Sequence, residues 1–568
     1  MMRSDRPLRW FVLSLWLAFI LRGTLHSLVA PMWDGFDEPF HLAYVTFVAN
    51  HGRPPGFSEP SFPGLILEAN RTLPSFLGYG APSFREWSQM THGERAAKRS
   101  EHDRMTGGTL SGKGVIYTGP NYERQQGPLY YYLAAPVAIA CSSCNLAHLL
   151  VALRLFSVIL ASLVVPLSAL LAFRTVGRSG LLVALPIVTF APNTLFFVDR
   201  VTNDALAWPL MAVICILLVE VTRPLVRFRH IAGLGIAITA GIWTKLTLLP
   251  ALPAAVVAMW LSGRTRPSDK SEERVPGRGR HSPLSLWSVA VAFPLFMTAL
   301  LVVWNRVSSG TFTGLAQSTA ATSSSPSQWL SAAGHAFSLS YLQRLSINHL
   351  WSGGWAFIQP AARWYVGAVL IFATILTTAR LARRKQLVDR PSHTEARPSS
   401  LPLVTFGLFF LAAMLFHVVS GTVAARQVSG FPAIGAEGWY LDLLRPLEAL
   451  LIAVLVMRHG TAPRWLSPLL VVFIVLTDLG ATASLLLPQW SGSASSAGLI
   501  VSLRTALEAT PIDVNGLILV AIAGLFALAV SAGIVSSLRV GSSPIRQPDD
   551  MPLDLHPSST SGRRPDAR

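Results

Sequence analysis

The chain has 568 residues, of which 51% are hydrophobic and only 13% are charged, and its mean hydropathy is +0.46. A water-soluble protein would carry about 25% charged residues, so this composition excludes an ordinary soluble protein. It also excludes a disordered or collagen-like chain, and three cysteines are too few for a disulfide scaffold. The net charge of +17 does not indicate nucleic-acid binding, because the basic residues fall mostly in short connections between apolar runs. An all-α polytopic membrane protein remains.

Apolar runs of bilayer-spanning length follow one another along the chain. A hydrocarbon core about 30 Å thick needs roughly 20 residues of helix. The run at 231–262 is too long for one span, and Gly241, Lys245 and Pro250 interrupt it, which predicts a tight helical hairpin near Lys245. With that hairpin counted as two spans, the sequence predicts about twelve transmembrane helices. The runs lie at 8–30, 148–173, 181–198, 204–222, 231–262, 285–304, 361–381, 401–420, 440–458, 464–487 and 515–538.

The short apolar stretch from Pro128 to Cys141 decides the topology, because counting it as a crossing would invert every later loop. If it stays outside as a juxtamembrane helix, the arginine-rich connections all lie on the inner face, as charge bias requires. At about 14 residues it is also short for a span. We therefore predict a multi-pass protein of the plasma or inner membrane, with an uncleaved first helix and both termini in the cytoplasm.

This topology divides the chain into a first transmembrane helix at 1–30, an outer (periplasmic) loop with juxtamembrane helices at 31–147, transmembrane helices 2–7 at 148–304, a second outer loop at 305–360, transmembrane helices 8–12 at 361–538, and a cytoplasmic disordered tail at 539–568. The first outer loop is far longer than a connection requires, and such loops commonly carry function. Within it, the residues at 56–120 have no clear periodicity, so the sequence does not predict their structure or their role.

Acidic residues gather directly after the first span. Pro39 predicts the start of a helix that runs to about Asn50. The acids before it could simply cap this helix. In a chain so poor in acids they could instead supply a general base or a metal-binding cluster at the outer interface. The group consists of Asp34, Asp37, Glu38 and His41.

Two further charged points fall on the same predicted face. Arg200 and Asp204 lie between the third and fourth spans and would face Asp37 across a cavity, although Asp204 could equally cap the fourth helix. Lys245 is a lone cation at the outer turn of the hairpin. Snorkelling to the interface would explain it, but a cation at that depth also suits the phosphate of an embedded lipid.

Two other patterns have simpler explanations. The stretch Gly107–Gly114 nearly spells a nucleotide-binding P-loop, but Gly114 replaces the required Ser or Thr and no strand precedes the stretch. ATP binding is therefore not expected. Cys141 and Cys144 form a CxxC pair without a second pair, which favours a local disulfide or two idle thiols over redox or zinc chemistry.

Taken in order, several stretches resemble the GT-C superfamily of membrane glycosyltransferases, which includes the protein O-mannosyltransferases and the bacterial lipid A aminoarabinose transferases. The similarity covers roughly residues 8–460. Trp439 stands where the family pattern has Arg, and Gln126-Gly127 stands where it has His-Pro. The stretches are Phe36-Asp37-Glu38, Gln126-Gly127-Pro128-Leu129-Tyr130-Tyr131, Arg200–Asp204 and Thr244-Lys245-Leu246-Thr247, with weaker matches at Leu350-Trp351-Ser352-Gly353-Gly354-Trp355 and Glu437-Gly438-Trp439-Tyr440-Leu441.

The resemblance implies transfer of a sugar from a polyprenyl-phosphate donor to an acceptor on the outer face, with inversion at the anomeric carbon. Asp37 would be the general base, and Lys245 and Arg200 would stabilise the leaving phosphate. The acceptor is a protein, a lipid or a glycan, and no cofactor is implied beyond a divalent cation, if one is used. The other substrate-binding candidates are Glu38, His41, Asp204 and Tyr440, and the metal-ligand candidates among them are Glu38, His41 and Asp204.

Other functions are compatible with sparse charges in a helical bundle. A transporter or lipid flippase would use them, but such proteins often show paired halves with broken helices, and the sequence shows no internal repeat. A catalytically silent relative that serves envelope assembly is a second alternative. In the simplest case, the outer acids are merely solvated and the cations merely anchor the chain to the interface.

Overall fold

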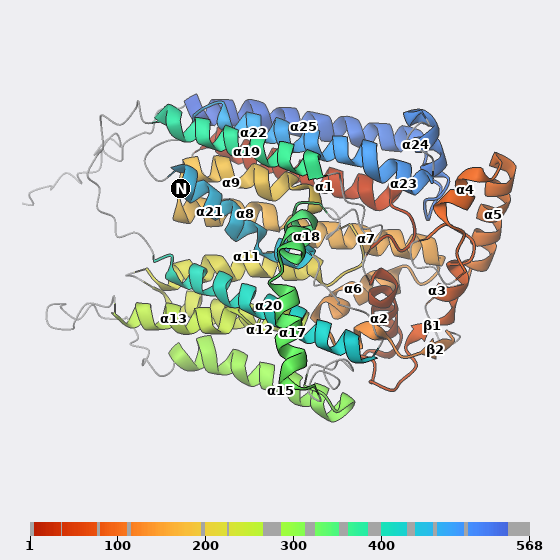
Figure 1. The fold of residues 1–568 in the computed structure, drawn as a ribbon, viewed down its shortest axis with the longest axis horizontal. Coiled ribbons are helices and arrows are strands. Elements are labelled where there is room, and N and C mark those ends of the chain that lie inside the picture. Colours follow the sequence, from red (N-terminus) through yellow and green to blue (C-terminus); the bar gives the residue numbers. More distant parts are fainter. Residues whose placement is uncertain are drawn as a thin grey trace, which may run out of the picture.

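Long helices run side by side in the computed structural model, and a layer of shorter elements covers one end of them (Figure 1). The structure describes residues 5–35, 37–75, 80–108, 110, 115–194, 199–223, 226–264, 286–312, 324–351, 362–383, 399–428, 438–457, 463–492 and 498–542. Within these ranges the only strands are two short ones. The predicted all-α polytopic fold is confirmed.

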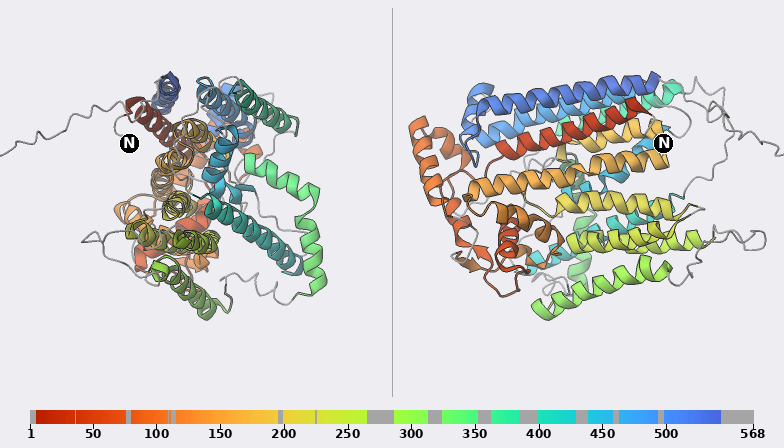
Figure 2. Two further views of the ribbon diagram at one scale, coloured as in Figure 1. Left: turned by 90° about the vertical axis from the view of Figure 1, so that its left-hand side faces the viewer. Right: turned by 180° about the vertical axis from the view of Figure 1, so that it is seen from behind.

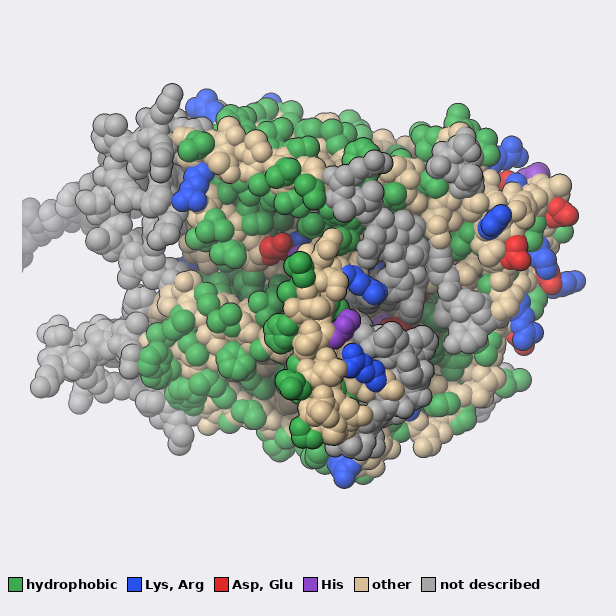
Figure 3. Space-filling view, viewed as in Figure 1, with side chains coloured by type: hydrophobic (Ala, Val, Ile, Leu, Met, Phe, Trp, Pro, Cys, Tyr) green, Lys and Arg blue, Asp and Glu red, His purple; other side chains and the backbone are tan. Residues whose placement is uncertain are grey.

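Nine helices in the described ranges are long and apolar enough to cross a membrane. Each lies at a predicted run, and on the face that Figure 3 shows, hydrophobic side chains are frequent over the long helices and charged ones are few. They comprise α1 (Arg6–Val29), α7 (Leu146–Ser162) continued by α8 (Val164–Thr175), α11 (Asp204–Val221), α13 (Ala251–Arg264), α15 (Phe293–Ser309) with the π-helical η5 (Ser288–Ala292) before it, α19 (Ala362–Arg383), α20 (Leu401–Val428), α22 (Leu466–Ala481) continued by η9 (Thr482–Leu486) and α23 (Leu487–Ser491), and α25 (Gly516–Ser542).

The other three predicted crossings are helices too, but shorter ones. They are α9 (Arg178–Phe190), α12 (Phe228–Thr244) and α21 (Arg445–Met457), with 13, 17 and 13 residues. Pro192 begins the 3-10 turn η3 (Pro192–Thr194) directly after α9, since proline cannot continue a helix's hydrogen bonding. α9 packs against α1, α8, α21 and α22, and its residues from Gly180 to Phe190 are all buried.

The predicted hairpin is present. α12 ends at Thr244, the chain passes through Lys245 and the 3-10 turn η4 (Leu246–Leu248), and α13 begins at Ala251. The turn lies within the bundle, next to the end that the shorter elements cover (Figure 1).

We call the layer at that end, residues 31–145, the platform. Its helix α2 (Glu38–His51) begins close to the predicted Pro39, and α6 (Leu129–Ala140) matches the predicted juxtamembrane stretch. α2 packs on α6, and α6 on α7. The segment without periodicity forms three helices and a small antiparallel sheet, in which Phe62 pairs with Gly119. Its elements are α3 (Gly64–Ala69), α4 (Phe84–Gln89), α5 (His92–Met105), β1 (Phe62–Pro63) and β2 (Tyr117–Gly119), and the 3-10 turn η2 (Tyr122–Gln125) follows the segment.

The predicted second outer loop contains two more helices, α17 (Pro326–Ala336) and α18 (Leu339–Leu350). Both run at a steep angle to the long helices, as Figures 1 and 2 show. α18 packs against the 3-10 helix η8 (Gly438–Leu444), which precedes α21. At the platform end, α24 (Leu499–Leu507) packs against α23, and α23 against α4. α18 and η8 thus connect the predicted second outer loop to the long helices, and α23 connects the long helices to the platform.

Candidate active site

Asp37 immediately precedes α2 but does not cap it. Its backbone is left-handed, with φ 55°, and its side chain makes no capping hydrogen bond. This conformation is uncommon outside glycine, and strained residues of this kind cluster at functional sites. The half-buried side chain has no hydrogen bond or ion pair with the residues that the structure describes. Capping therefore does not account for Asp37, and none of the described residues holds its carboxylate in a structural bond.

Charged neighbours and burial together set the protonation of Asp37. Burial raises the pKa of its carboxyl to about 6, Lys245 and Arg200 oppose that rise, and Asp204 adds to it. A carboxyl with this pKa is mostly ionised at neutral pH. Because its pKa is close to neutral pH, it can also take up a proton effectively. The site thus has a group with the properties of a general base.

Lys245 and Asp204 form a buried ion pair beside Asp37. The Lys245 Nζ lies 2.5 Å from the Asp204 Oδ1, and the two residues are 8% and 9% exposed. Thr202 donates its hydroxyl to the other Asp204 oxygen, 3.2 Å away. The two simpler explanations, snorkelling for Lys245 and helix capping for Asp204, do not match this geometry. Lys245 does not extend to solvent, and the Asp204 carboxylate pairs with a cation.

Two further candidates adjoin this pair. The Tyr440 ring, from η8, lies 5.6 Å from the Lys245 Nζ, within the range of a cation–π contact. Arg200 is buried, and its side chain lies against Gly35, where an added Cβ would come within 2.7 Å of it. The structure therefore brings Asp37, Arg200, Asp204, Lys245 and Tyr440 to one junction.

Glu38 is different, although it follows Asp37 in sequence. It is fully buried, and its two oxygens accept hydrogen bonds from Arg154 at 2.8 and 2.7 Å. One of them also accepts the Val201 backbone N–H at 3.1 Å. Because these contacts occupy the carboxylate, the geometry opposes the substrate- or metal-binding role expected of Glu38. Glu38 instead forms a structural ion pair with Arg154, which joins α2 to α7.

His41 also faces a protein partner. Its Nδ1 lies 2.8 Å from the Tyr131 hydroxyl, and the two rings stack. Burial lowers the pKa of His41 well below its usual value, so the ring is neutral. The three metal-ligand candidates, Glu38, His41 and Asp204, thus have separate partners. Across the described ranges, no three His, Cys, Asp or Glu side chains are grouped as metal ligands.

Sequence reasoning missed two charged residues here. Glu123 on η2 is 4% exposed; burial and then Asp37 raise the pKa of its carboxyl to about 8. Nothing in its local pattern distinguishes it from an ordinary loop acid. Arg154, the partner of Glu38, interrupts the apolar run of α7. A charge inside a predicted span was a usable signal, since such residues are rarely idle.

Gln126 and Gly127 join the platform to the hairpin. A Cβ on Gly127 would lie 2.0 Å from the Trp243 carbonyl oxygen, so only glycine permits this approach of two backbones. Asn203 donates its amide to the Gln126 Oε1 at 3.3 Å and to the Thr244 carbonyl at 3.0 Å. The departure from the family's His-Pro pattern therefore coincides with a close packing contact.

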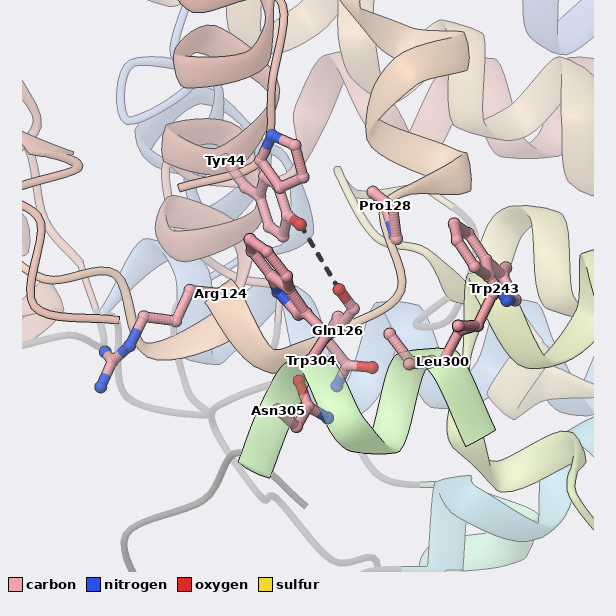
Figure 4. A pocket seen from close by; sticks show the side chains of 10 residues that line it. Tyr44, Arg124, Gln126, Pro128, Trp243, Leu300, Trp304 and Asn305 are labelled. Carbon is pink, nitrogen blue, oxygen red and sulfur yellow. Dashed lines mark hydrogen bonds between the residues drawn. The ribbon is translucent and has the colours of Figure 1, made fainter. Parts of the chain in front are cut away.

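A cavity of about 350 Å³ adjoins the junction through Gln126. Figure 4 shows Tyr44 hydrogen-bonded to the Gln126 carbonyl on one side, with Trp304 and Asn305 of α15 opposite. Trp243 and Leu300 also line it. Only one face of α15 is buried. On its other face, Val303 and Val307 are 57% and 80% exposed. The cavity thus lies between the charged junction and a helix whose other face is apolar and exposed.

The remaining expectations concern features away from this junction. Cys141 and Cys144 form the local disulfide. The P-loop-like stretch follows the helix α5, and Thr109 and residues 111–114 lie outside the described ranges, as do Phe36, residues 352–355 and Glu437. Leu350 ends α18, and Gly438 begins η8.

Comparison with known proteins places the chain in a family. A solved structure, ArnT from Cupriavidus metallidurans bound to undecaprenyl phosphate, is similar at 14% identity and a TM-score of 0.38, over 88% of this chain and 75% of that one. No curated protein matches the sequence significantly. The profile of a family described as "Predicted membrane protein (DUF2142)" matches residues 20–441, and the chain therefore belongs to this family of polytopic membrane proteins.

Proposed function

We propose that the protein is a GT-C-type membrane glycosyltransferase that transfers a sugar from a polyprenyl-phosphate donor to an acceptor at the platform end, which faces the outside. One observation carries the proposal: the Asp37 carboxylate is half-buried, without a protein hydrogen bond in the described ranges, and under the influence of Lys245 and Arg200. An acid in this state can take a proton, and cations beside it can stabilise an anionic leaving group.

In the proposed reaction, an acceptor hydroxyl or amine attacks the anomeric carbon on the side opposite the phosphate. The new bond forms as the bond from carbon to phosphate oxygen breaks, so the configuration inverts. Asp37 takes the acceptor's proton, and the polyprenyl phosphate leaves with the bonding electron pair. Its growing negative charge is stabilised by Lys245 and Arg200. Asp204 and the Tyr440 ring hold the Lys245 ammonium in place.

The cavity suits the apolar part of this donor. Its lining includes Tyr44, Trp243, Leu300 and Trp304, and α15, which lines one side of it, carries exposed apolar residues on its other face. Isoprenoid units can enter such a site from the bilayer, because an apolar lining keeps them out of water as the lipid tails do. A donor held in this way reaches Lys245 with its phosphate at the membrane interface. Partners are thus the lipid-linked sugar and membrane lipids.

The direct test uses membranes that contain the wild-type protein or Asp37→Asn, with a panel of radiolabelled polyprenyl-phosphate sugars. Asparagine keeps the shape of aspartate but cannot act as the base, so transfer should fall by roughly 10²- to 10⁴-fold. Asp103→Asn, on the exposed face of α5, is the matched control and should retain full transfer. Transfer that survives in Asp37→Asn would refute the assigned base. A wild type inactive with every donor would count against the glycosyltransferase itself.

A further inference from the structure

One amide side chain of α15 is buried without a hydrogen bond. Asn305 is only 1% exposed, and it directly follows the apolar stretch at 299–304. Its side-chain Nδ2 is buried and has no hydrogen-bond partner in the ranges that the structure describes. A buried amide donor without an acceptor lowers the stability of the fold. The packing of α15 alone therefore does not account for an asparagine at this position.

Asn305 lines the cavity of about 350 Å³ beside the junction. Figure 4 shows it next to Trp304 on α15, with Tyr44 on the opposite side. This wall of the cavity is fastened to the hairpin, because the Trp243 indole donates a hydrogen bond to the Met297 carbonyl at 3.1 Å. The Asn305 amide thus borders a space that a ligand can occupy.

The position of Asn305 along α15 suits contact with a lipid head group. The apolar run of the sequence ends at residue 304, and α15 continues only to Ser309. Trp304, next to Asn305, is 53% exposed, and tryptophan is enriched where a membrane meets water. We therefore expect Asn305 to lie near the level at which an embedded lipid changes from apolar chain to head group.

We propose that the Asn305 side-chain amide donates a hydrogen bond to a phosphate oxygen of the lipid-linked donor. This inference rests on the proposed function and adds a binding residue to it. In such a donor the phosphate directly follows the first isoprenoid unit, so a chain that occupies the cavity brings phosphate oxygens to its lining first. Ionised phosphate oxygens only accept hydrogen bonds, which matches a buried donor that lacks an acceptor. Lys245 supplies charge, and Asn305 supplies a directed hydrogen bond.

Binding of undecaprenyl phosphate to the purified full-length protein tests this contact with the variant Asn305→Leu. Leucine has a similar branched shape but cannot donate a hydrogen bond. Binding should weaken by roughly 10- to 100-fold, the loss expected for one hydrogen bond to a charged group. The melting temperature without lipid should stay the same or rise, because the variant removes a buried donor that the described residues leave without a partner. A purely structural role would lower it.

A second lipid and a matched variant separate the possible outcomes. Undecaprenol lacks the phosphate, so Asn305→Leu should weaken its binding less; an equal loss for both lipids would mean that leucine only reshapes the cavity, and would overturn the inference. Thr298→Val changes the same buried face of α15 outside the cavity lining, where the hydroxyl bonds only to the Pro294 carbonyl, and should bind normally. Unchanged binding of undecaprenyl phosphate by Asn305→Leu would refute this contact and leave the proposed function standing. A wild type that does not bind this lipid would refute the donor class and, with it, the contact.

Discussion

Two acids that are neighbours in the sequence belong to two very different regions of this molecule. Asp37 lies at the junction of the platform and the hairpin, half-buried, with left-handed backbone and no protein hydrogen bond in the described ranges. Glu38 lies one residue further inside, fully buried and bound on both oxygens by Arg154. The comparison teaches that a buried charge can serve either chemistry or packing, and that the completeness of its hydrogen bonding distinguishes the two.

Removing Arg154 should have the largest effect on the structural region. Arg154→Ala leaves Glu38 buried without its partner, so the free energy of unfolding should fall by about 3–5 kcal/mol. Denaturation of the purified protein in detergent measures this. Asp37→Asn should leave the same quantity unchanged or slightly raised, because it removes a half-buried charge that no hydrogen bond from the described residues compensates. Equal losses in both variants would end the distinction between the two regions.

Removing the cation of the junction should affect rate more than stability. Lys245→Met keeps the length of the side chain without its charge, and we expect kcat for sugar transfer to fall by roughly 10²- to 10³-fold, as for other electrostatic stabilisers of a transition state. Single-turnover transfer in membranes measures it, with the control Lys98→Met on α5, where the lysine is half-exposed and pairs only with Glu101 among the described residues. A change confined to KM would show that Lys245 contributes to binding of the donor but does not stabilise the transition state.

The close approach of platform and hairpin can be tested by adding a single carbon. Gly127→Ala puts a Cβ 2.0 Å from the Trp243 carbonyl oxygen, so one backbone must move. Such overpacking typically costs about 1–3 kcal/mol. The same movement would displace Gln126, so transfer should fall together with the melting temperature. The control Gly93→Ala lies on α5, where nothing surrounds the glycine, so it should leave transfer unchanged and should not lower the melting temperature.

The pH dependence of transfer should give the smallest effect. Because the pKa of Asp37 is raised to about 6, its base form is lost as pH falls through 6. The value of kcat/KM should therefore drop about tenfold per pH unit below that point. Lys245 opposes the rise in this pKa, so Lys245→Met should move the acidic limb to higher pH. A limb that stays in place would show that another group titrates there.

Local sequence patterns predicted a large part of this fold. Hydropathy located the spans because a bilayer imposes a minimum apolar length on each helix. Proline and glycine placed the start of α2 and the hairpin at Lys245, since these residues act on the backbone where they stand. The elements of residues 56–120 were not predictable, because they depend on packing against one another and on α23, not on a periodic apolar face.

The candidate site shows the same division. The sequence by itself determined a polytopic helical membrane protein and the presence of Asp37, Arg200, Asp204 and Lys245 near predicted helix ends. Only the tertiary structure decided that Lys245 pairs with Asp204, that Arg154 pairs with Glu38, and that Glu123 lies near Asp37. The physical reason is distance along the chain. Partners 41 and 116 residues apart are selected by how helices pack, and no local pattern encodes that choice.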